Sequence, residues 1–299
     1  MKVLVTGING FVGKNLESYL QNSSLLLGGL LRTNRQVSYC DTQLHFFDTF
    51  DNADVENITC GYDCIIHLAA LVHQPDQKDI EQYMRLNCDF TVKLARAAIA
   101  NGVGKFIFLS TSHVYEGIDS VYHEQLELKP TSPYAQSKHQ ASLSLLRLFS
   151  GINSKLYIIR PPLIYGQGVK GNMKSLSKLI NKTQLTPFLL ARAKRSYICI
   201  DNLCSFILHL IDADVQPGIY NVSDNDDLST SELSSLIAAA NDKQLFQLPI
   251  PKNIMKLFFS IVRKQDQWEK IYSEFRLNIN KAISTGWKPK PIDYRDFVL

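Results

Sequence analysis

The chain has 299 residues, of which 45% are hydrophobic and 20% charged, and its formal net charge at pH 7 is +4. This length and composition are typical of a globular protein with a large core, and they exclude a low-complexity or disordered chain. The small net charge does not indicate nucleic-acid binding, and no apolar run approaches the roughly 18 residues of a membrane span. Because a predicted strand already begins at residue 2, we expect no signal peptide and a cytoplasmic protein.

The cysteines lack the paired spacing of a zinc site, since the nearest pair, Cys60 and Cys64, has no second pair to complete a ligand set. We therefore expect no metal and six free thiols in a reducing compartment. The six are Cys40, Cys60, Cys64, Cys88, Cys199 and Cys204.

An aliphatic run at Lys2–Thr6 leads into a glycine-rich turn, and an amphipathic helix opens directly after it. Gly7 permits the tight turn, Gly10 lets backbone N–H groups approach a pyrophosphate, and Gly13 lets the helix pack close to the strand. The N-terminus of the helix adds partial positive charge. The order of strand, turn and helix therefore predicts a dinucleotide-binding unit. Its expected contacts are Gly7, Asn9, Gly10, Phe11, Val12 and Gly13.

Leu25–Arg32 is the second predicted strand, and the residue that closes it meets the adenosine ribose in this kind of unit. An acidic residue there accepts a hydrogen bond from the ribose 2′-hydroxyl of NAD, whereas an arginine suits the 2′-phosphate of NADP. This chain has Arg32, with Arg35 nearby and no carboxylate before Asp41. The pattern favours NADP over NAD, although two solvated loop arginines would look the same.

The next two predicted strands are Leu44–Phe47, which ends at Asp48, and the nearly continuous apolar run Asp63–Leu68. An uninterrupted apolar run is typical of a parallel strand that is covered on both faces. It ends in Ala69 and Ala70, which are small enough for a nicotinamide nucleotide to lie against the backbone. His67 and His73 fit structural or solvent-exposed positions better than a catalytic one. A predicted helix, Glu81–Asn101, contains Asn87.

Another buried strand, Lys105–Leu109, runs into a cluster of hydroxyl residues, Ser110–Tyr115. Ligands of open α/β sheets bind at the carboxyl ends of the strands. Tyr134 and Lys138 follow at the start of an amphipathic helix, and positions i and i+4 share a helical face. We expect the Lys138 ammonium to lower the pKa of Tyr134 toward neutrality, and the Thr111 hydroxyl to bridge to a substrate oxygen. Tyr-x3-Lys alone also occurs by chance.

The ordered set of motifs resembles the extended short-chain dehydrogenases/reductases of the NAD-dependent epimerase/dehydratase family, which act on nucleotide sugars. The resemblance implies an α/β fold, with a Rossmann-type doubly wound parallel sheet and a smaller α/β substrate-binding C-terminal domain. It implies a Rossmann domain at 1–165 plus 196–225, and a substrate-binding domain at 166–195 and 226–299. The motifs are the glycine turn, His67–Ala70, Asn87, Ser110–Tyr115, Tyr134 with Lys138, Arg160–Gly166, Arg195–Ile198, Asp201–Leu203, Tyr220–Val222 and Gly286–Pro289.

The resemblance also implies a role for each matching residue. Thr111, Tyr134 and Lys138 would be catalytic. The cofactor contacts beyond the glycine turn would be Arg32, Asp48, Leu68, Ala69, Ala70, Asn87, Tyr134, Lys138 and Pro161. The substrate contacts would be Thr111, Ser112, His113, Tyr134, Asn172, Arg195 and Arg276, of which Asn172 and Arg195 would hold a diphosphate. Helices 81–101 and 134–149 would pair across a homodimer.

The branch most similar to Arg160–Met173 reduces the 4-keto group of UDP-linked acetamido sugars, or epimerises C4 of related sugars, for surface polysaccharides such as O-antigen. Arg32 favours an NAD(P)H-dependent 4-ketoreductase over a 4-epimerase with tightly bound NAD. A dehydratase is disfavoured, because Ser112 and His113 stand where Asp-Glu would follow the catalytic threonine. A third reading is a non-catalytic cofactor-binding protein.

One further apolar run, Ile254–Val262, raises the question of a contact with a membrane surface. Nine residues give little affinity for lipid, and no long basic amphipathic face accompanies them. We therefore expect a buried packing helix here.

Overall fold

The computed structural model describes residues 1–21, 24–32, 43–47, 53–72, 79–115, 121–169 and 171–298. At its centre lies a seven-stranded sheet in the order β11-β7-β5-β4-β1-β2-β3, and each neighbouring pair is parallel. The predicted α/β class with a Rossmann-type doubly wound sheet is confirmed. The strands are β1 Lys2–Thr6, β2 Leu26–Arg32, β3 Gln43–Phe47, β4 Cys64–His67, β5 Lys105–Leu109, β7 Lys155–Arg160 and β11 Gly218–Asn221.

Alternate side chains of the central strands enter different cores, which is why these strands read as continuous apolar runs. In β1, Val3 and Val5 belong to one buried cluster and Leu4 to another. In β5, Ile107 belongs to the first cluster, and Phe106 and Phe108 belong to the second. The sheet is thus buried on both faces, and its carboxyl edge is left to form a site.

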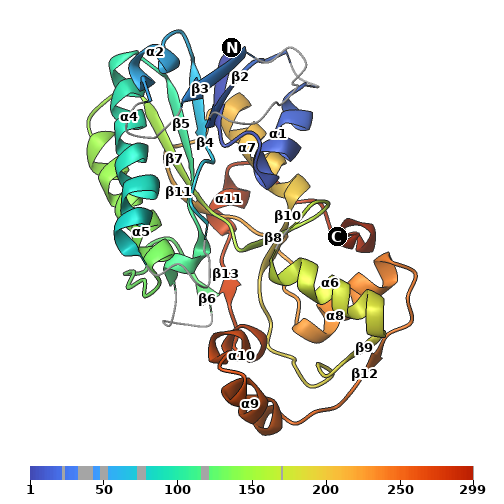
Figure 1. Cartoon of the computed structure of the whole chain (residues 1–299). Helices are drawn as coiled ribbons and strands as arrows, with labels where there is room; N and C mark the ends of the chain where they lie inside the picture. The colour runs from blue at the N-terminus through green and yellow to red at the C-terminus, as the bar shows by residue number, and fades with distance from the viewer. Residues whose placement is uncertain are drawn as a thin grey trace.

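Helices cover the two faces, as Figure 1 shows. One face carries α2, α4 and α5, and the other carries α1, α7 and α11. The helix predicted at 81–101 is a continuous run interrupted by a π-helical segment, η1. The bounds are α1 Phe11–Gln21, α2 Val55–Thr59, α3 Ile80–Met84, η1 Arg85–Asp89, α4 Phe90–Ala100, α5 Pro133–Leu148, α7 Ile200–Asp212 and α11 Asn280–Ser284.

The remaining elements lie below the carboxyl edge of the sheet in Figure 1 or along its loops. Ser229 and Glu232 form a reciprocal capping box at the start of α8. The helices are α6 Asn172–Thr183, α8 Thr230–Ala240, α9 Lys252–Ile261 and α10 Gln265–Tyr272, with 3-10 turns η2 Ser112–Tyr115 and η3 Tyr294–Phe297. The paired short strands are β6 Val121–Tyr122 with β13 Arg276–Leu277, β8 Leu163–Tyr165 with β10 Tyr197–Cys199, and β9 Leu185–Thr186 with β12 Phe246–Gln247.

The C-terminal segment returns to the main sheet. The Trp287 indole donates to the hydroxyl oxygen of Ser205 in α7 at 3.0 Å, and Phe297 stacks on Tyr165 with ring centroids 4.2 Å apart. Residues 196–225 also lie there, since α7 packs against α1 and β11 pairs with β7. The division into two domains at the predicted boundaries stays a prediction.

Five cysteines, Cys60, Cys64, Cys88, Cys199 and Cys204, are free thiols as predicted, and Cys40 lies outside the described residues. Within the described ranges, no helix has both the length and the apolar character that crossing a membrane requires.

The prediction of a buried packing helix at 254–262 is wrong. Of the residues of α9, Met255 and Phe259 are buried, whereas Leu257 is 63% exposed and Ile261 is 72% exposed. The apolar run in the sequence shows that the helix carries apolar side chains on more than one face. It does not show whether a neighbouring element covers each of those faces.

Candidate active site

The glycine turn between β1 and α1 is packed at distances that only glycine permits. Gly7 has φ +71°, and a Cβ there would lie 2.8 Å from the backbone nitrogen of Ala69. A Cβ on Gly13 would lie 2.4 Å from the Gly7 carbonyl oxygen. The first turn of α1 carries no acidic residue, and the N–H groups of a first turn have no partner within the helix. The turn therefore fits the pyrophosphate of a dinucleotide.

A buried network fixes the end of β4 beside this turn. His67 is fully buried; its Nδ1 lies 2.6 Å from the Thr6 hydroxyl, and its Nε2 lies 2.8 Å from the Thr91 hydroxyl. The Thr91 hydroxyl donates to the Asn87 carbonyl, so His67 must donate from Nε2 and accept at Nδ1. Burial lowers the pKa of His67 to about 3, so the ring is neutral. The prediction that His67 is structural is confirmed.

The Thr6 hydroxyl also accepts a hydrogen bond from the Ala69 backbone N–H at 3.2 Å. This bond holds the Ala69–Ala70 segment against the end of β1. The Ala69–Ala70 segment therefore lies beside the glycine turn.

Asn87, in the π-helical segment, braces this edge of the sheet. Its side-chain amide accepts from the Leu71 N–H at 2.7 Å and donates to the Leu71 carbonyl at 3.0 Å. It also donates to the Ser137 hydroxyl at 3.0 Å, and that hydroxyl donates to the Tyr134 carbonyl at 2.8 Å. Both amide hydrogens are thus used inside the protein. Asn87 positions the segment after Ala70 against α5, a role that the sequence did not predict.

The hydroxyl cluster is tied to β7 by backbone hydrogen bonds. Ser110 donates its N–H to the Ile159 carbonyl at 2.8 Å, and Ser112 donates its N–H to the Pro161 carbonyl at 2.9 Å. Thr111, which is buried, accepts from the His113 N–H at 3.2 Å. Thr111, Ser112 and Pro161 therefore meet at the carboxyl edge of the sheet.

The start of α5 places Tyr134 at this edge. Ser132 caps the helix by accepting from the Ala135 N–H at 3.3 Å, and Pro133 occupies its first turn. The Thr111 hydroxyl lies close enough to the Tyr134 hydroxyl to lower the pKa of that phenol. One turn further along, the Lys138 ammonium lies 3.9 Å from the centroid of the Phe108 ring, with the side chain almost fully buried. Thr111, in the loop after β5, and Tyr134 and Lys138 of α5 thus lie at this edge, and their catalytic roles stay a prediction.

Two aromatic neighbours enclose the Tyr134 ring edge-on, His113 at 6.5 Å and Tyr83 at 6.3 Å between centroids. Tyr134 as a residue is only partly buried, but its hydroxyl is desolvated.

The expected pKa of Tyr134 is not found. Burial raises the pKa of Tyr134 to about 12, although the Thr111 hydrogen bond acts in the opposite direction. Burial also lowers the pKa of Lys138 to about 7. The sequence predicted that the Lys138 ammonium lies near the Tyr134 phenol. It could not show that burial also lowers the pKa of Lys138, so that the amine is only partly protonated near pH 7. At neutral pH, Tyr134 is therefore a protonated phenol that can donate to an oxygen.

A second buried network stands behind the site. Arg160 donates from Nη1 to the Tyr115 oxygen at 2.7 Å, and the Tyr115 hydroxyl donates to the Asn221 side-chain oxygen at 2.8 Å. Glu124 accepts from the Asn221 N–H at 2.9 Å. The network joins β7, β11 and η2. The sequence motifs contain these residues but gave no sign of their connection.

The predicted substrate residues lie on the smaller elements. Asn172 is the exposed first residue of α6. Arg195 donates to the Ser273 carbonyl at 3.0 Å, and Arg276 donates to Asp227 at 2.6 Å. Arg195 and Phe275 form a backbone bridge, so the two arginines share one short ladder, and each is engaged within the protein.

An aromatic column runs from that ladder through Tyr122 to Tyr115 of η2. The Tyr115 and Tyr122 rings stack with centroids 5.3 Å apart, and Tyr122 lies 4.7 Å from Phe275. The Arg195 guanidinium lies 5.0 Å from the centroid of the Phe275 ring. The arginine ladder is thus packed against η2.

The residue predicted to meet the adenosine ribose closes β2, where Arg32 pairs with Phe47 of β3. The side chain of Arg32 and the whole of Arg35, Asp48 and His73 lie outside the described residues.

Known proteins are similar to this chain in sequence. A sequence model described as the NAD dependent epimerase/dehydratase family matches residues 3–223. The UDP-glucose 4-epimerase of Vibrio cholerae is 34% identical to the chain, covering 96% of the chain and 90% of the relative. The GDP-6-deoxy-D-mannose reductase of Pseudomonas aeruginosa is 25% identical, covering 97% of the chain and 92% of the relative.

Solved structures share the fold at low identity. A UDP-glucuronic acid 4-epimerase from Bacillus cereus, in complex with NAD, superposes with a TM-score of 0.81 at 20% identity, covering 99% of this chain and 94% of that one. The structure of RMD from Pseudomonas aeruginosa, complexed with NADPH, gives a TM-score of 0.73 at 22% identity, covering 99% and 96%.

Proposed function

We propose, since this chain belongs to the NAD-dependent epimerase/dehydratase family of enzymes, that it carries out oxidoreduction at C4 of a UDP-linked N-acetylhexosamine-type sugar. The observation that carries the proposal is the pairing of the Tyr134 phenol with the Thr111 hydroxyl, with Lys138 one turn further along α5. These groups stand at the carboxyl edge of the sheet, where the glycine turn also ends.

In the direction of ketone reduction, Tyr134 donates its phenolic proton to the C4 oxygen, and Thr111 holds the same oxygen by a hydrogen bond. A bound nicotinamide dinucleotide supplies the hydride. Lys138, when protonated, stabilises the phenolate that the transfer leaves behind. Because Thr111 and Lys138 are almost fully buried, these interactions are stronger than they would be in water.

The dinucleotide would lie along the glycine turn, with its pyrophosphate at the N-terminus of α1 and its nicotinamide between Ala69–Ala70 and Pro161. Asp48 would meet the adenine and Arg32 the ribose.

The substrate diphosphate would be held by Asn172 and Arg195, with Arg276 nearby. The Arg195 guanidinium donates to a neutral carbonyl in this structure, and a phosphate is a stronger, charged acceptor for the same group. If the substrate phosphate replaced the Ser273 carbonyl as the acceptor, substrate binding would change the contacts of the Arg195 ladder.

Two readings of the same chemistry remain. A 4-ketoreductase uses the site once and consumes NAD(P)H, and Arg32 together with the protonated Tyr134 favours it. A 4-epimerase uses the site twice and regenerates its cofactor, and the 34% identical UDP-glucose 4-epimerase favours that reading. We place the reductase first.

Denaturing the purified protein and identifying the released dinucleotide separates these two. We expect little bound dinucleotide, together with NADPH oxidation that requires a 4-keto nucleotide sugar. Stoichiometric NAD, with C4 inversion and no net oxidation, would establish the epimerase instead.

Tyr134→Phe tests the proposal as a whole. It removes the transferred proton, so we expect turnover to fall about 10²- to 10⁴-fold with dinucleotide affinity retained. Tyr294→Phe is the matched control, since Tyr294 is 51% exposed and has no place in the site. If wild type and Tyr134→Phe bind dinucleotide and are equally inert on a panel of nucleotide sugars, the chain is a non-catalytic cofactor-binding protein.

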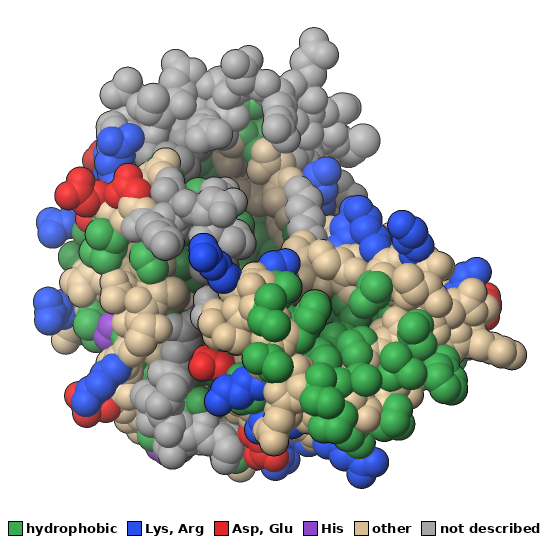
Figure 2. All heavy atoms as spheres, turned by 60° about the horizontal axis from the view of Figure 1, so that its bottom comes forward, with side chains coloured by type: hydrophobic (Ala, Val, Ile, Leu, Met, Phe, Trp, Pro, Cys, Tyr) green, Lys and Arg blue, Asp and Glu red, His purple; other side chains and the backbone are tan. Residues whose placement is uncertain are grey.

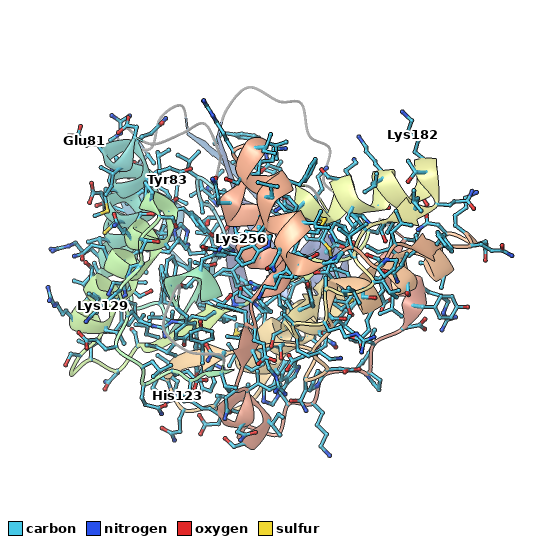
Figure 3. All side chains as sticks on the ribbon, turned by 90° about the horizontal axis from the view of Figure 1, so that it is seen from below. Glu81, Tyr83, His123, Lys129, Lys182 and Lys256 are labelled. Atoms are coloured by element: carbon cyan, nitrogen blue, oxygen red, sulfur yellow. The ribbon has the colours of Figure 1, made fainter. Side chains whose placement is uncertain are left out.

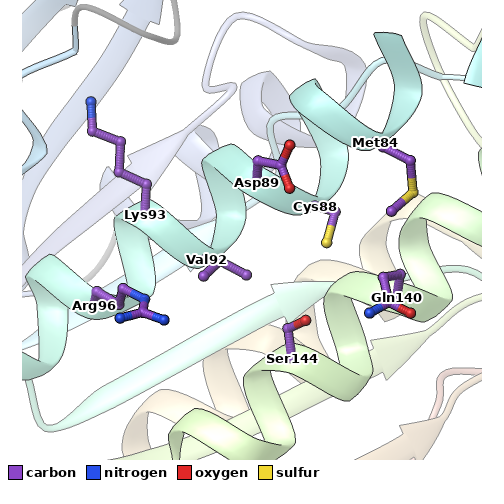
Figure 4. A pocket seen from close by; sticks show the side chains of 8 residues that line it. All are labelled: Met84, Cys88, Asp89, Val92, Lys93, Arg96, Gln140 and Ser144. Carbon is purple, nitrogen blue, oxygen red and sulfur yellow. The ribbon is translucent and has the colours of Figure 1, made fainter. Parts of the chain in front are cut away.

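We also propose a homodimer that pairs the helices of residues 81–101 and 134–149. A hollow of about 440 Å³ lies between these helices, and Figure 4 shows the side chains that line it. A groove between two surface helices can receive the side chains of the same helices from a second copy. The side chains that line it are Met84, Cys88, Asp89, Val92, Lys93, Arg96, Gln140 and Ser144.

A further inference from the structure

We propose that α9 docks this enzyme onto an anionic lipid surface. The inference does not depend on the proposed reaction. It rests on the exposed apolar face of the helix and on the charge around it.

The exposed apolar residues of α9 form one stripe. Ile254, Leu257, Phe258 and Ile261 follow the spacing i, i+3, i+4, i+7, which places them on a single helical face. They are 58%, 63%, 53% and 72% exposed respectively. A contiguous row of large, mostly exposed apolar side chains marks a contact surface rather than ordinary surface variation.

The other side of α9 is already anchored to the protein. Met255 and Phe259 are buried in a small core with Phe188, Ala191 and Tyr272. The stripe therefore cannot turn inward without breaking that core. The same packing places the turn with Leu189 and Leu190, which are 38% and 41% exposed, beside the helix.

The surface around the stripe is basic. Residues 252–264 contain Lys252, Lys256, Arg263 and Lys264, hence four cations, and no acidic residue, so this short segment alone equals the +4 net charge of the chain. Arg263 and Lys264 directly follow the stripe. Figure 2 shows hydrophobic side chains gathered on this face with Lys and Arg side chains around it, and Figure 3 shows Lys256 on α9 and Lys182 at the end of α6.

Lys252 and Lys256 lie over the Trp268 ring, 5.2 Å and 5.3 Å from its centroid, and so on another side of the helix from the stripe. A helix with its side chains is about 10 Å across. The Debye length at physiological ionic strength is about 8 Å, so these two charges act only weakly on a surface in contact with the stripe, and the attraction comes mainly from the exposed Arg263 and Lys264. The neighbouring helix α10 contains Asp266 and Glu269 with Lys270, so it adds a net charge of −1 against the four cations of residues 252–264.

Charge decides between a lipid surface and a second copy of the chain. A two-fold contact through the stripe would bring two identical cationic segments together, and their repulsion would oppose it. An anionic bilayer complements both the apolar stripe and the cations, and two such signals together are what stable interfacial binding requires.

The test is co-sedimentation of the full chain with vesicles of phosphatidylcholine containing phosphatidylglycerol. We expect binding that weakens at least ten-fold when phosphatidylglycerol is omitted, and that also weakens as NaCl is raised. The variant Leu257→Ser/Phe258→Ser/Ile261→Ser should lose at least ten-fold in partitioning. The control is Leu26→Ser, because Leu26 is 62% exposed at the distant start of β2.

All three substituted residues are exposed, so circular dichroism and thermal unfolding should match wild type. The proposal is overturned if wild type does not sediment with these vesicles, or if the triple variant binds them as well as wild type does. A triple variant that changes mass in light scattering, with vesicle binding intact, would instead make this face a contact between copies.

Discussion

The burial of the Lys138 ammonium could not be predicted from the position of this residue in the sequence. Its ammonium is almost fully buried and lies over the Phe108 ring, and burial lowers its pKa from 10.5 to about 7. Near neutral pH, about half of the Lys138 amines are therefore protonated. The amine can be charged when a phenolate needs it and neutral otherwise.

This burial makes the stability of the protein depend on pH. Between pH 7 and 10.5 the unfolded chain binds a proton at Lys138 and the folded chain does not, so the free energy of unfolding rises with pH in that window. Below pH 7 both states are protonated, and the whole cost of burying the charge is present. From pH 7 to 9.5 the gain from this group is about 3 kcal/mol.

Urea unfolding of wild type and Lys138→Met at pH 7.0 and 9.5 measures this contribution. We expect the difference in stability between the two proteins to change by about 3 kcal/mol between the two pH values, with methionine relatively better at pH 7. Comparing the variants cancels the titration of other groups, such as the buried cysteines. An unchanged difference would mean that Lys138 has an ordinary pKa.

The run from Ile80 to Ala100 shows what a helix pattern predicts and what it leaves out. Apolar periodicity predicted the helix to within a residue at each end, but not the π-helical segment, Arg85–Asp89, inside it. That segment presents Asn87 to Leu71 and Ser137. π-helical turns are frequent at functional sites, and this one serves the predicted cofactor edge.

The groove between α4 and α5 gives the homodimer proposal a sharp test. Val92 lines the groove, and Val92→Arg would place a charge where two copies are proposed to meet, which costs several kcal/mol when it is buried without a partner. Light scattering at micromolar concentration should show a dimer for wild type and a monomer for this variant. Ile152→Arg, at an exposed loop position, should remain dimeric. A monomeric wild type would contradict the proposal.

Local patterns predicted the elements well because strands that are buried on both faces and amphipathic helices leave strong signals. Lys2–Thr6 and Lys105–Leu109 agree with the structure residue for residue. What the sequence could not provide depends on partners distant in the chain. The pairing of Arg276 with Asp227 and the exposed stripe of α9 both follow from tertiary packing.

The candidate site divides in the same way. The spacing of the Ser110–Tyr115 cluster, Tyr134 and Lys138 predicted their meeting, since each follows or opens an element whose end the fold determines. The electrostatics of Tyr134 were predicted wrongly, because burial outweighs the nearby cation and spacing carries no information about burial. His67 and Arg160 belong to motifs that the sequence showed, but the motifs did not reveal the networks that these residues form.

At the scale of the whole molecule, the last strand of the central sheet, β11, lies far along the sequence from β7, the strand with which it pairs. Strand β7 ends at Arg160, and the chain then forms β8, α6 and β9 before α7 and β11 return to cover the sheet and extend its edge. Trp287 and Phe297 then pack behind them, on α7 and on Tyr165 of β8.

During synthesis on the ribosome, the central sheet therefore cannot be completed when the first 165 residues have emerged. The surfaces of α1 and β7 that α7 and β11 cover stay exposed until translation has reached Asp212 for α7 and Asn221 for β11. Truncating the gene after β7 would leave those apolar surfaces bare permanently. The central sheet and the elements that lie between β7 and β11 in the sequence therefore form one folding unit.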